Sequence, residues 1–122
     1  MAGRSVPASK KRAYRLGHHA EWLAVLWLML KGYRLLARRY RTKLGEIDLI
    51  VKRGGTVAFV EVKARTSHDA AEDSITVAAE RRIRNAADIW LARHPGAEGL
   101  TFRFDIVLIA PWRLPKHLAN AF

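Results

Sequence analysis

Hydrophobic and polar positions alternate along residues 45–65, GEIDLIVKRGGTVAFVEVKAR, with two glycines in the middle of the stretch. Alternation with a period of two is typical of β-strands. The pair Gly54-Gly55 accepts the positive φ angles of a two-residue hairpin turn. The pattern therefore predicts two antiparallel strands that pair in the register in which Arg53 faces Thr56.

This register places two carboxylates opposite each other, because it makes Asp48 face Glu61. Both are expected to share one face of the hairpin with Glu46 and Lys63. The other face is expected to be apolar and to join the core through Ile47, Leu49, Val60 and Val62. Facing side chains have Cβ atoms about 5 Å apart, where like charges repel. The pattern leaves two explanations open: a structural ion-pair network with the neighbouring charges, or a bound divalent cation such as Mg²⁺.

The remaining elements follow from hydrophobic periodicity. Residues 13–31 predict a helix that ends at Gly32, and residues 33–42 predict a first strand. Residues 75–94 predict a second helix with one apolar stripe, and residues 101–110 predict a last strand that is apolar on both faces. The helix-strand-strand-strand-helix-strand order predicts an α/β fold in which helices flank a mixed sheet.

Within the first helix, residues 22–30 are uncharged and apolar on all sides. A membrane-spanning helix needs about 20 such residues, so we expect no membrane span. A helix of this kind is usually buried on several sides, and we also expect it to contribute to a homodimer contact.

Composition and charge limit the classes of protein and partner. The chain has 122 residues, with 22 Lys and Arg against 11 Asp and Glu, and a net charge of +11. This favours nucleic acid as the partner, with an anionic membrane surface and a ribosomal complex as alternatives. Cysteine is absent, which excludes disulfides and thiolate metal sites and is consistent with a cytoplasmic location.

We expect a single domain over residues 13–110. Residues 1–12 are polar and basic and predict a disordered arm, and residues 111–122 predict a loose basic tail. Residues 66–74 predict a polar loop beside the hairpin.

Seven basic side chains on the hairpin, the first strand and the second helix are candidates for contacts with phosphate groups: Arg38, Arg39, Arg41, Lys63, Arg65, Arg81 and Arg82. Two tyrosines interleave the basic residues of the first strand, which is typical of surfaces that bind nucleic acid. The same pattern is also typical of a solvated edge strand whose charge prevents aggregation.

Two strings resemble a known family. GEIDLI at residues 45–50 and FVEVKAR at residues 59–65 resemble the bacterial YraN family, and the resemblance runs from about Leu16 to Ile109. Asp48, followed in the next strand by Glu61-Val62-Lys63, resembles the D…(D/E)xK core of the restriction-endonuclease-like nucleases. The resemblance implies the α-β-β-β-α-β core of that superfamily, similar to archaeal Holliday-junction resolvases.

The resemblance also implies an activity. It implies a Mg²⁺-dependent endonuclease, with Mn²⁺ as an alternative metal, that acts on DNA rather than RNA and includes structured or branched DNA among its substrates. Asp48, Glu61 and the backbone carbonyl of Val62 would hold the metal. Lys63 would stand beside the attacking water and the phosphate, and Glu21 on the first helix would complete the site.

The chain departs from the family pattern at one position. YraN-like sequences typically carry a lysine early in the second helix, where Ala79 or Glu80 stands here, so Arg81 or Arg82 would replace it.

Asp105 in the last strand is expected to form an ion pair with an arginine rather than to join the site. Two other functions stay open: a nucleic-acid-binding module without turnover, and an assembly factor that docks through the first helix.

Overall fold

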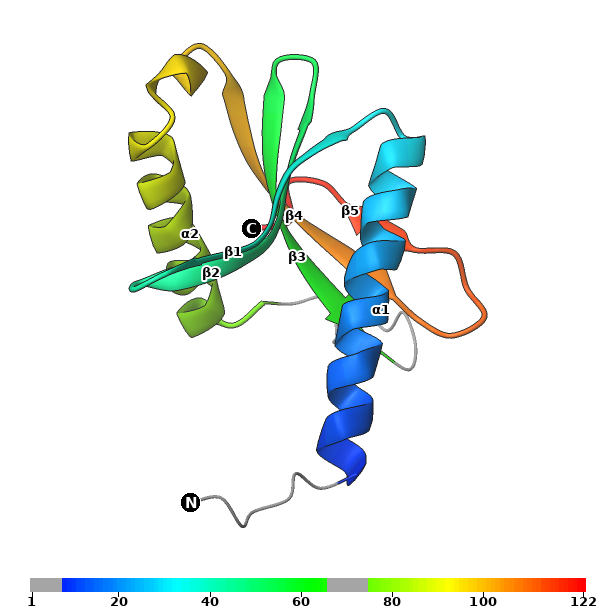
Figure 1. The fold of residues 1–122 in the computed structure, drawn as a ribbon. Coiled ribbons are helices and arrows are strands. Elements are labelled where there is room, and N and C mark those ends of the chain that lie inside the picture. Colours follow the sequence, from blue (N-terminus) through cyan, green and yellow to red (C-terminus); the bar gives the residue numbers. More distant parts are fainter. Residues whose placement is uncertain (1–7, 66–74) are drawn as a thin grey trace.

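In the computed structural model, two helices enclose a five-stranded sheet (Figure 1). The structure describes the backbone of residues 8–65 and 75–122, and the side chains of residues 19–65 and 75–122. In chain order the elements are α1 (Ala8–Leu30), β1 (Arg34–Thr42), β2 (Gly45–Arg53), β3 (Thr56–Ala64), α2 (Val77–Ala92), the 3₁₀ turn η2 (Pro95–Ala97), β4 (Thr101–Ile109) and β5 (Lys116–Leu118). The predicted α/β class with a mixed sheet is confirmed.

The strands follow one another across the sheet in the order β1-β2-β3-β4-β5. β1, β2 and β3 are antiparallel neighbours, and β4 lies parallel to β3. Parallel neighbours need a crossover, and α2 lies on the segment that supplies it. The predicted hairpin register is confirmed, since Arg53 pairs with Thr56 and Leu49 with Val60. β3, which carries Glu61 and Lys63, is the central strand.

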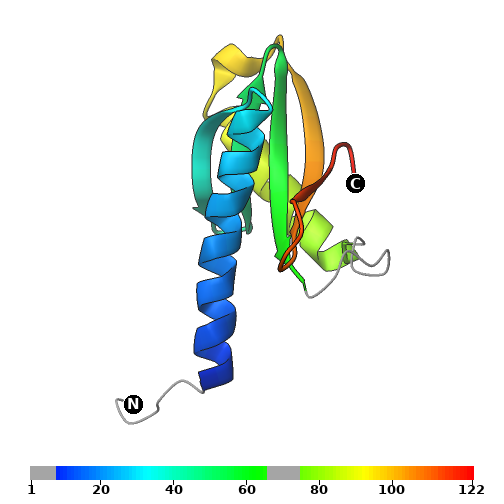
Figure 2. The ribbon, with the colours of Figure 1, turned by 90° about the vertical axis from the view of Figure 1, so that its right-hand side faces the viewer.

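Each helix covers one face of the sheet and has its own core (Figures 1 and 2). The core under α1 is formed by Ala24, Val25, Leu28, Tyr33, Leu49, Val51, Ala58, Val60 and Val107. The core under α2 is formed by Ile47, Ile50, Val57, Phe59, Ile83, Ala86, Ala87, Trp90 and Ala97. Full burial of one large apolar side chain contributes about 1.5–3 kcal/mol, so these two cores hold the helices against the central strands.

Of the part of α1 whose side chains the structure describes, residues 19–30, one side is buried by this chain. Ala20, Ala24 and Leu28, which are four residues apart and share one face, are at most 2% exposed. Large apolar side chains on the outer face are about half exposed or more: Trp22, Leu23, Leu26, Met29 and Leu30. The expectation that this helix is buried on several sides is therefore wrong for the single chain. Among the described residues, no helix is long and apolar enough to cross a membrane.

The start of each helix differs from the predicted start. α1 begins at Ala8, so residues 8–12 of the expected arm are helical. Residues 1–7 and the expected loop at residues 66–74 lie outside the described residues. α2 begins after Thr76, whose hydroxyl accepts a hydrogen bond from the backbone N–H of Ala79 at 3.1 Å and so caps the helix.

The C-terminal segment is more ordered than a loose tail. β5 pairs with β4, with Val107 opposite His117. The ring of Phe122 packs against that of Phe104 at a centroid distance of 5.3 Å. The expectation of a loose tail is therefore wrong for this part of residues 111–122.

Candidate metal and active site

Asp48 lies where the ladder of β2 is interrupted. β1 pairs with β2 on both sides of the position at which Arg39 would face Asp48, but not at that position. Arg39 has φ 55°, in the left-handed region. Pairing of β2 with β3 begins only at Leu49, the residue after Asp48 in the chain.

This interruption changes the direction of the side chains that follow. Strict alternation would place Ile47 and Leu49 on one face of the strand. Instead, Ile47 joins the core under α2, whereas Leu49 joins the core under α1. The expectation that both belong to one core face is therefore wrong.

The carboxyl groups of Asp48 and Glu61 meet as the register predicts, although the backbone ladder ends one pair earlier. The two side chains are hydrogen-bonded to each other, which requires that one of them carries a proton. Oδ2 of Asp48 also accepts a hydrogen bond from the backbone N–H of Val62 at 2.8 Å. This bond fixes the aspartate side chain to β3, beside the glutamate.

Burial raises the pKa of both carboxyl groups. Desolvation is the largest cause for each. The charge of Asp48 adds to it at Glu61, and the charges of Glu21 and Glu46 add to it at Asp48. The pKa of Asp48 rises to about 6 and that of Glu61 to about 8, although the positive charge of Lys63 lowers the pKa of Glu61 in part. Lys63 itself is buried, with 8% of its surface exposed.

These raised pKa values have a consequence for stability. The contribution of the pair to the free energy of unfolding is fully present below the ordinary carboxyl pKa values of 3.8 and 4.5. It is lost as the pH rises through about 6 and about 8, because the native state must then hold two buried negative charges. At neutral pH and above, the pair therefore favours an added positive charge.

A hollow of about 100 Å³ opens beside the carboxyl pair. It is lined by Glu46, Asp48, Glu61, Ala79, Arg82 and Ile83. The last three belong to α2, so the helix forms one wall and brings a guanidinium group to the site. Of the two residues expected to replace the family lysine, Arg82 is the one that lines this hollow.

Glu21 on α1 is held by two arginines of β1. Its Oε1 accepts hydrogen bonds from Nε of Arg39 at 2.8 Å and from Nη1 of Arg38 at 3.3 Å. Its negative charge contributes to the raised pKa of Asp48, so it lies within electrostatic reach of the carboxyl pair. The guanidinium of Arg38 also lies over the ring of Trp22, 4.5 Å from its centroid.

The other basic candidates lie on the surface. Nε of Arg41 is 3.6 Å from a carboxylate oxygen of Glu46, and both side chains are at least half exposed. Arg65 follows the end of β3 and donates a hydrogen bond to the carbonyl of Ala64. Arg81 is exposed on α2.

Asp105 does not belong to this site. It is fully buried on β4, and it accepts two hydrogen bonds of 2.8 Å from Arg103, one of 2.7 Å from Nε2 of His117 and one of 2.9 Å from the backbone of Asn120. Burial alone would raise the pKa of Asp105, but these bonds and the charge of Arg103 together lower it to about 2. The expected ion pair with an arginine is confirmed.

The carboxyl pair fits a hard divalent cation by its donor set. Mg²⁺ is commonly bound by one or two carboxylates and keeps several waters. Within the parts of the chain that the structure describes, no group of three or more His, Cys, Asp or Glu side chains is arranged to hold a metal ion. A cation at this place would therefore take two carboxylates from Asp48 and Glu61, and its other ligands from the backbone, water or substrate.

The family described as "Uncharacterised protein family UPF0102" matches residues 20–109. The chain belongs to family UPF0102. A UPF0102 protein of Mesorhizobium japonicum is 58% identical over 115 residues, which cover 94% of this chain and 92% of that protein. A UPF0102 protein of Rhizobium johnstonii is 50% identical over 122 residues, which cover all of both chains.

UPF0102 membership confirms the resemblance to the YraN family, and the family's name states no activity. The part that matches UPF0102 contains the carboxyl pair and the residues around it: Glu21, Arg38, Arg39, Asp48, Glu61, Lys63 and Arg82.

Proposed function

We propose that the chain is a metal-dependent endonuclease of the restriction-endonuclease-like superfamily that hydrolyses phosphodiester bonds in DNA, including structured or branched DNA. The observation that carries the proposal is the partly buried pair of Asp48 and Glu61, whose pKa values are raised, beside Lys63 and Arg82. Two desolvated carboxylates next to cationic side chains are a costly arrangement for stability alone, and they are typical of sites that act on phosphate groups. We propose Mg²⁺ as the cofactor, with Mn²⁺ as an alternative.

In this proposal each residue near the pair has a role. Asp48 and Glu61 would hold the cation, and the backbone carbonyl of Val62 would add an oxygen ligand. The chemistry that such a cation would supply is polarisation of the scissile phosphate and a lower pKa for a bound water. Lys63 would orient the attacking water and neutralise negative charge on the phosphate as the bond breaks. Glu21, which the arginines of β1 hold near the pair, acts as an outer carboxylate through a water.

The charge of the chain supports DNA as the partner. Arg82, which lines the hollow, would contact phosphates together with three other exposed arginines: Arg41, Arg65 and Arg81. Arg38 and Arg39 would also contact phosphates, and those phosphates would compete with Glu21 for the two guanidinium groups. A net charge of +11 releases many counterions on binding, so affinity should fall steeply as salt rises.

Cleavage of DNA tests the proposal. We expect the purified protein to cut duplex, single-stranded or branched DNA in Mg²⁺ or Mn²⁺, and we expect EDTA to stop the reaction. Asp48→Asn should lower the rate at least about 100-fold because it removes a charged ligand. Asp88→Asn, which changes an exposed carboxylate on α2, is the matched control and should cut like the wild type. The proposal fails if no DNA is cut, or if Asp48→Asn cuts at the wild-type rate.

Two other functions have an observation in their favour. The net charge of +11 and the exposed arginines would serve equally a module that binds nucleic acid without turnover. The exposed apolar face of α1 favours an assembly factor, and it is also where the proposed homodimer would form. Analytical ultracentrifugation of the purified chain checks the dimer, and a chain that stays monomeric at all concentrations contradicts it.

A further inference from the structure

A groove runs between β1 and the C-terminal half of α2. One hollow in it, of about 830 Å³, is lined in part by Lys43 and Arg93. A second, of about 380 Å³, is lined in part by Arg34, Lys52 and His94. Arg93 and His94, which line one hollow each, are consecutive at the C-terminal end of α2. We call these five residues and the hollows that they line the β1–α2 groove.

The groove is positively charged. No carboxylate lines either hollow, and of the arginines that line the larger one, Arg41 is paired with Glu46 outside the hollow. Within the described residues, Arg34, Lys43, Lys52 and Arg93 have no carboxylate partner. Arg34 and Lys52 are also directly opposite each other in the β1–β2 ladder, where like charges are destabilising. This accumulation of positive charge favours a polyanion as the occupant.

An aromatic pair forms part of the wall of the groove. The rings of Trp90 and His94 are stacked, with centroids 4.1 Å apart and an angle of 16° between their planes. Nδ1 of His94 donates a hydrogen bond to the carbonyl of Trp90 at 2.7 Å, which fixes the orientation of the imidazole. Trp90 is buried and His94 is exposed, so the imidazole covers the indole and is accessible from the groove.

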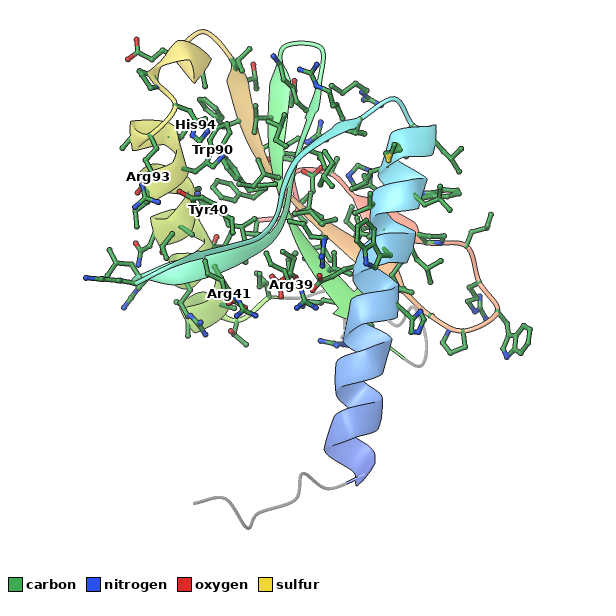
Figure 3. All side chains as sticks on the ribbon, viewed as in Figure 1. Arg39, Tyr40, Arg41, Trp90, Arg93 and His94 are labelled. Atoms are coloured by element: carbon green, nitrogen blue, oxygen red, sulfur yellow. The ribbon has the colours of Figure 1, made fainter. Side chains whose placement is uncertain are left out.

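The hairpin links the groove to the carboxyl pair. Figure 3 shows Tyr40 on the side of β1 that faces Trp90, Arg93 and His94, and Nη1 of Arg93 donates a hydrogen bond to its hydroxyl at 3.2 Å. Arg39 lies on the other side of β1 (Figure 3) and pairs with Glu21, whereas Arg41 lines the larger hollow and is 3.6 Å from a carboxylate oxygen of Glu46. A strand bound at the carboxyl pair therefore meets positive charge on both sides of the hairpin.

We propose that the β1–α2 groove binds a single-stranded segment of the nucleic acid that the carboxyl pair cleaves. Lys43 and Arg93 contact its phosphates, and the imidazole of His94 stacks on one of its bases. Stacking on His94 requires an unpaired base, so the preferred substrate has a single-stranded segment next to the cleaved bond. This inference rests on the proposed function and adds the class of DNA structure that the site accepts.

Binding without metal tests the inference, because it does not depend on turnover. Fluorescence anisotropy in EDTA would compare the full chain on a blunt duplex and on the same duplex with a single-stranded overhang. We expect His94→Ala to weaken binding of the overhang DNA at least about fivefold and to leave blunt-duplex binding unchanged. His94→Phe keeps a flat ring and should restore most of the affinity. His19→Ala, which removes an exposed histidine on α1, is the matched control.

The dependence of binding on salt tests the proposed contact between Arg93 and phosphate separately. Arg93→Ala should reduce the slope of log affinity against log salt by about one on overhang DNA. Arg113→Ala removes an exposed arginine outside the groove and should leave that slope unchanged. Equal binding by wild type and His94→Ala, or equal losses on blunt and overhang DNA, would overturn the inference and leave the nuclease proposal standing. A wild-type chain that binds no DNA would overturn both.

Discussion

Asp105→Ala is expected to lower the free energy of unfolding by about 3–5 kcal/mol, the usual cost of removing one partner from a buried ion pair. The carboxylate is fully buried, and its loss leaves Arg103, His117 and the backbone N–H of Asn120 without their acceptor. The same change releases β5, since His117 and Asn120 lie on and just after that strand.

Urea unfolding at pH 7 measures this loss, with Asp88→Ala as the control because it removes an exposed carboxylate.

The contribution of Asp105 to the free energy of unfolding depends on pH with a definite sign. The pKa of Asp105 is lowered to about 2, so its contribution is present above the ordinary value of 3.8 and is lost as the pH falls through about 2. The difference between wild type and variant should therefore persist at pH 5. A variant that unfolds within about 0.5 kcal/mol of the wild type would contradict this role.

Gly45→Ala is expected to destabilise the fold by about 3 kcal/mol, because overpacking against backbone cannot be relieved by a rotamer change. A Cβ at Gly45 would lie 1.9 Å from the carbonyl oxygen of Arg82 and 2.6 Å from its carbonyl carbon. In Figure 1 the end of the β1–β2 hairpin crosses α2. The added methyl group would push the helix away and widen the hollow beside the carboxyl pair, which α2 closes on one side.

Gly55→Ala is the matched control for this substitution. It lies in the adjacent hairpin turn, and a Cβ there would meet nothing within 4 Å. Thermal unfolding of both variants separates a specific clash from a general effect of adding a methyl group. If Gly45→Ala melted at the same temperature as the wild type, the close approach of β2 to α2 would be wrong.

The hairpin could be predicted from the sequence because its determinants are local. Alternation with a period of two and the Gly54-Gly55 turn fix the register, and the register brings Asp48 to Glu61. The resemblance to the YraN family was equally accessible, because GEIDLI and FVEVKAR are short contiguous strings.

The irregularity at Asp48 could not be predicted from the sequence. It depends on the left-handed backbone of Arg39 and on the separate packing of Ile47 and Leu49 under different helices. The ion pairs of Glu21 could not be predicted from the sequence either. Its two arginine partners come from a strand whose position relative to α1 is set by tertiary packing.

The network around Asp105 was missed in part for a similar reason. The sequence favoured an arginine partner for this aspartate, and Arg103 is that partner. His117 was not expected because its strand is three residues long and has no detectable period. Similarly, the run in α1 is apolar on both its buried and its exposed face, so hydrophobicity alone does not reveal which side meets the sheet.

The central claim is that Asp48 and Glu61 form a cation site. Calorimetric titration with Mn²⁺ tests this claim most directly. Binding must displace the proton that the pair holds between its pKa values of about 6 and about 8. We therefore expect affinity to fall about tenfold for each unit as the pH decreases from 8 to 6. Glu61→Gln should lose binding, and Glu98→Gln, which changes an exposed glutamate beyond α2, should keep it. Equal binding by wild type and Glu61→Gln, or an affinity that does not change between pH 8 and pH 6, would contradict the claim.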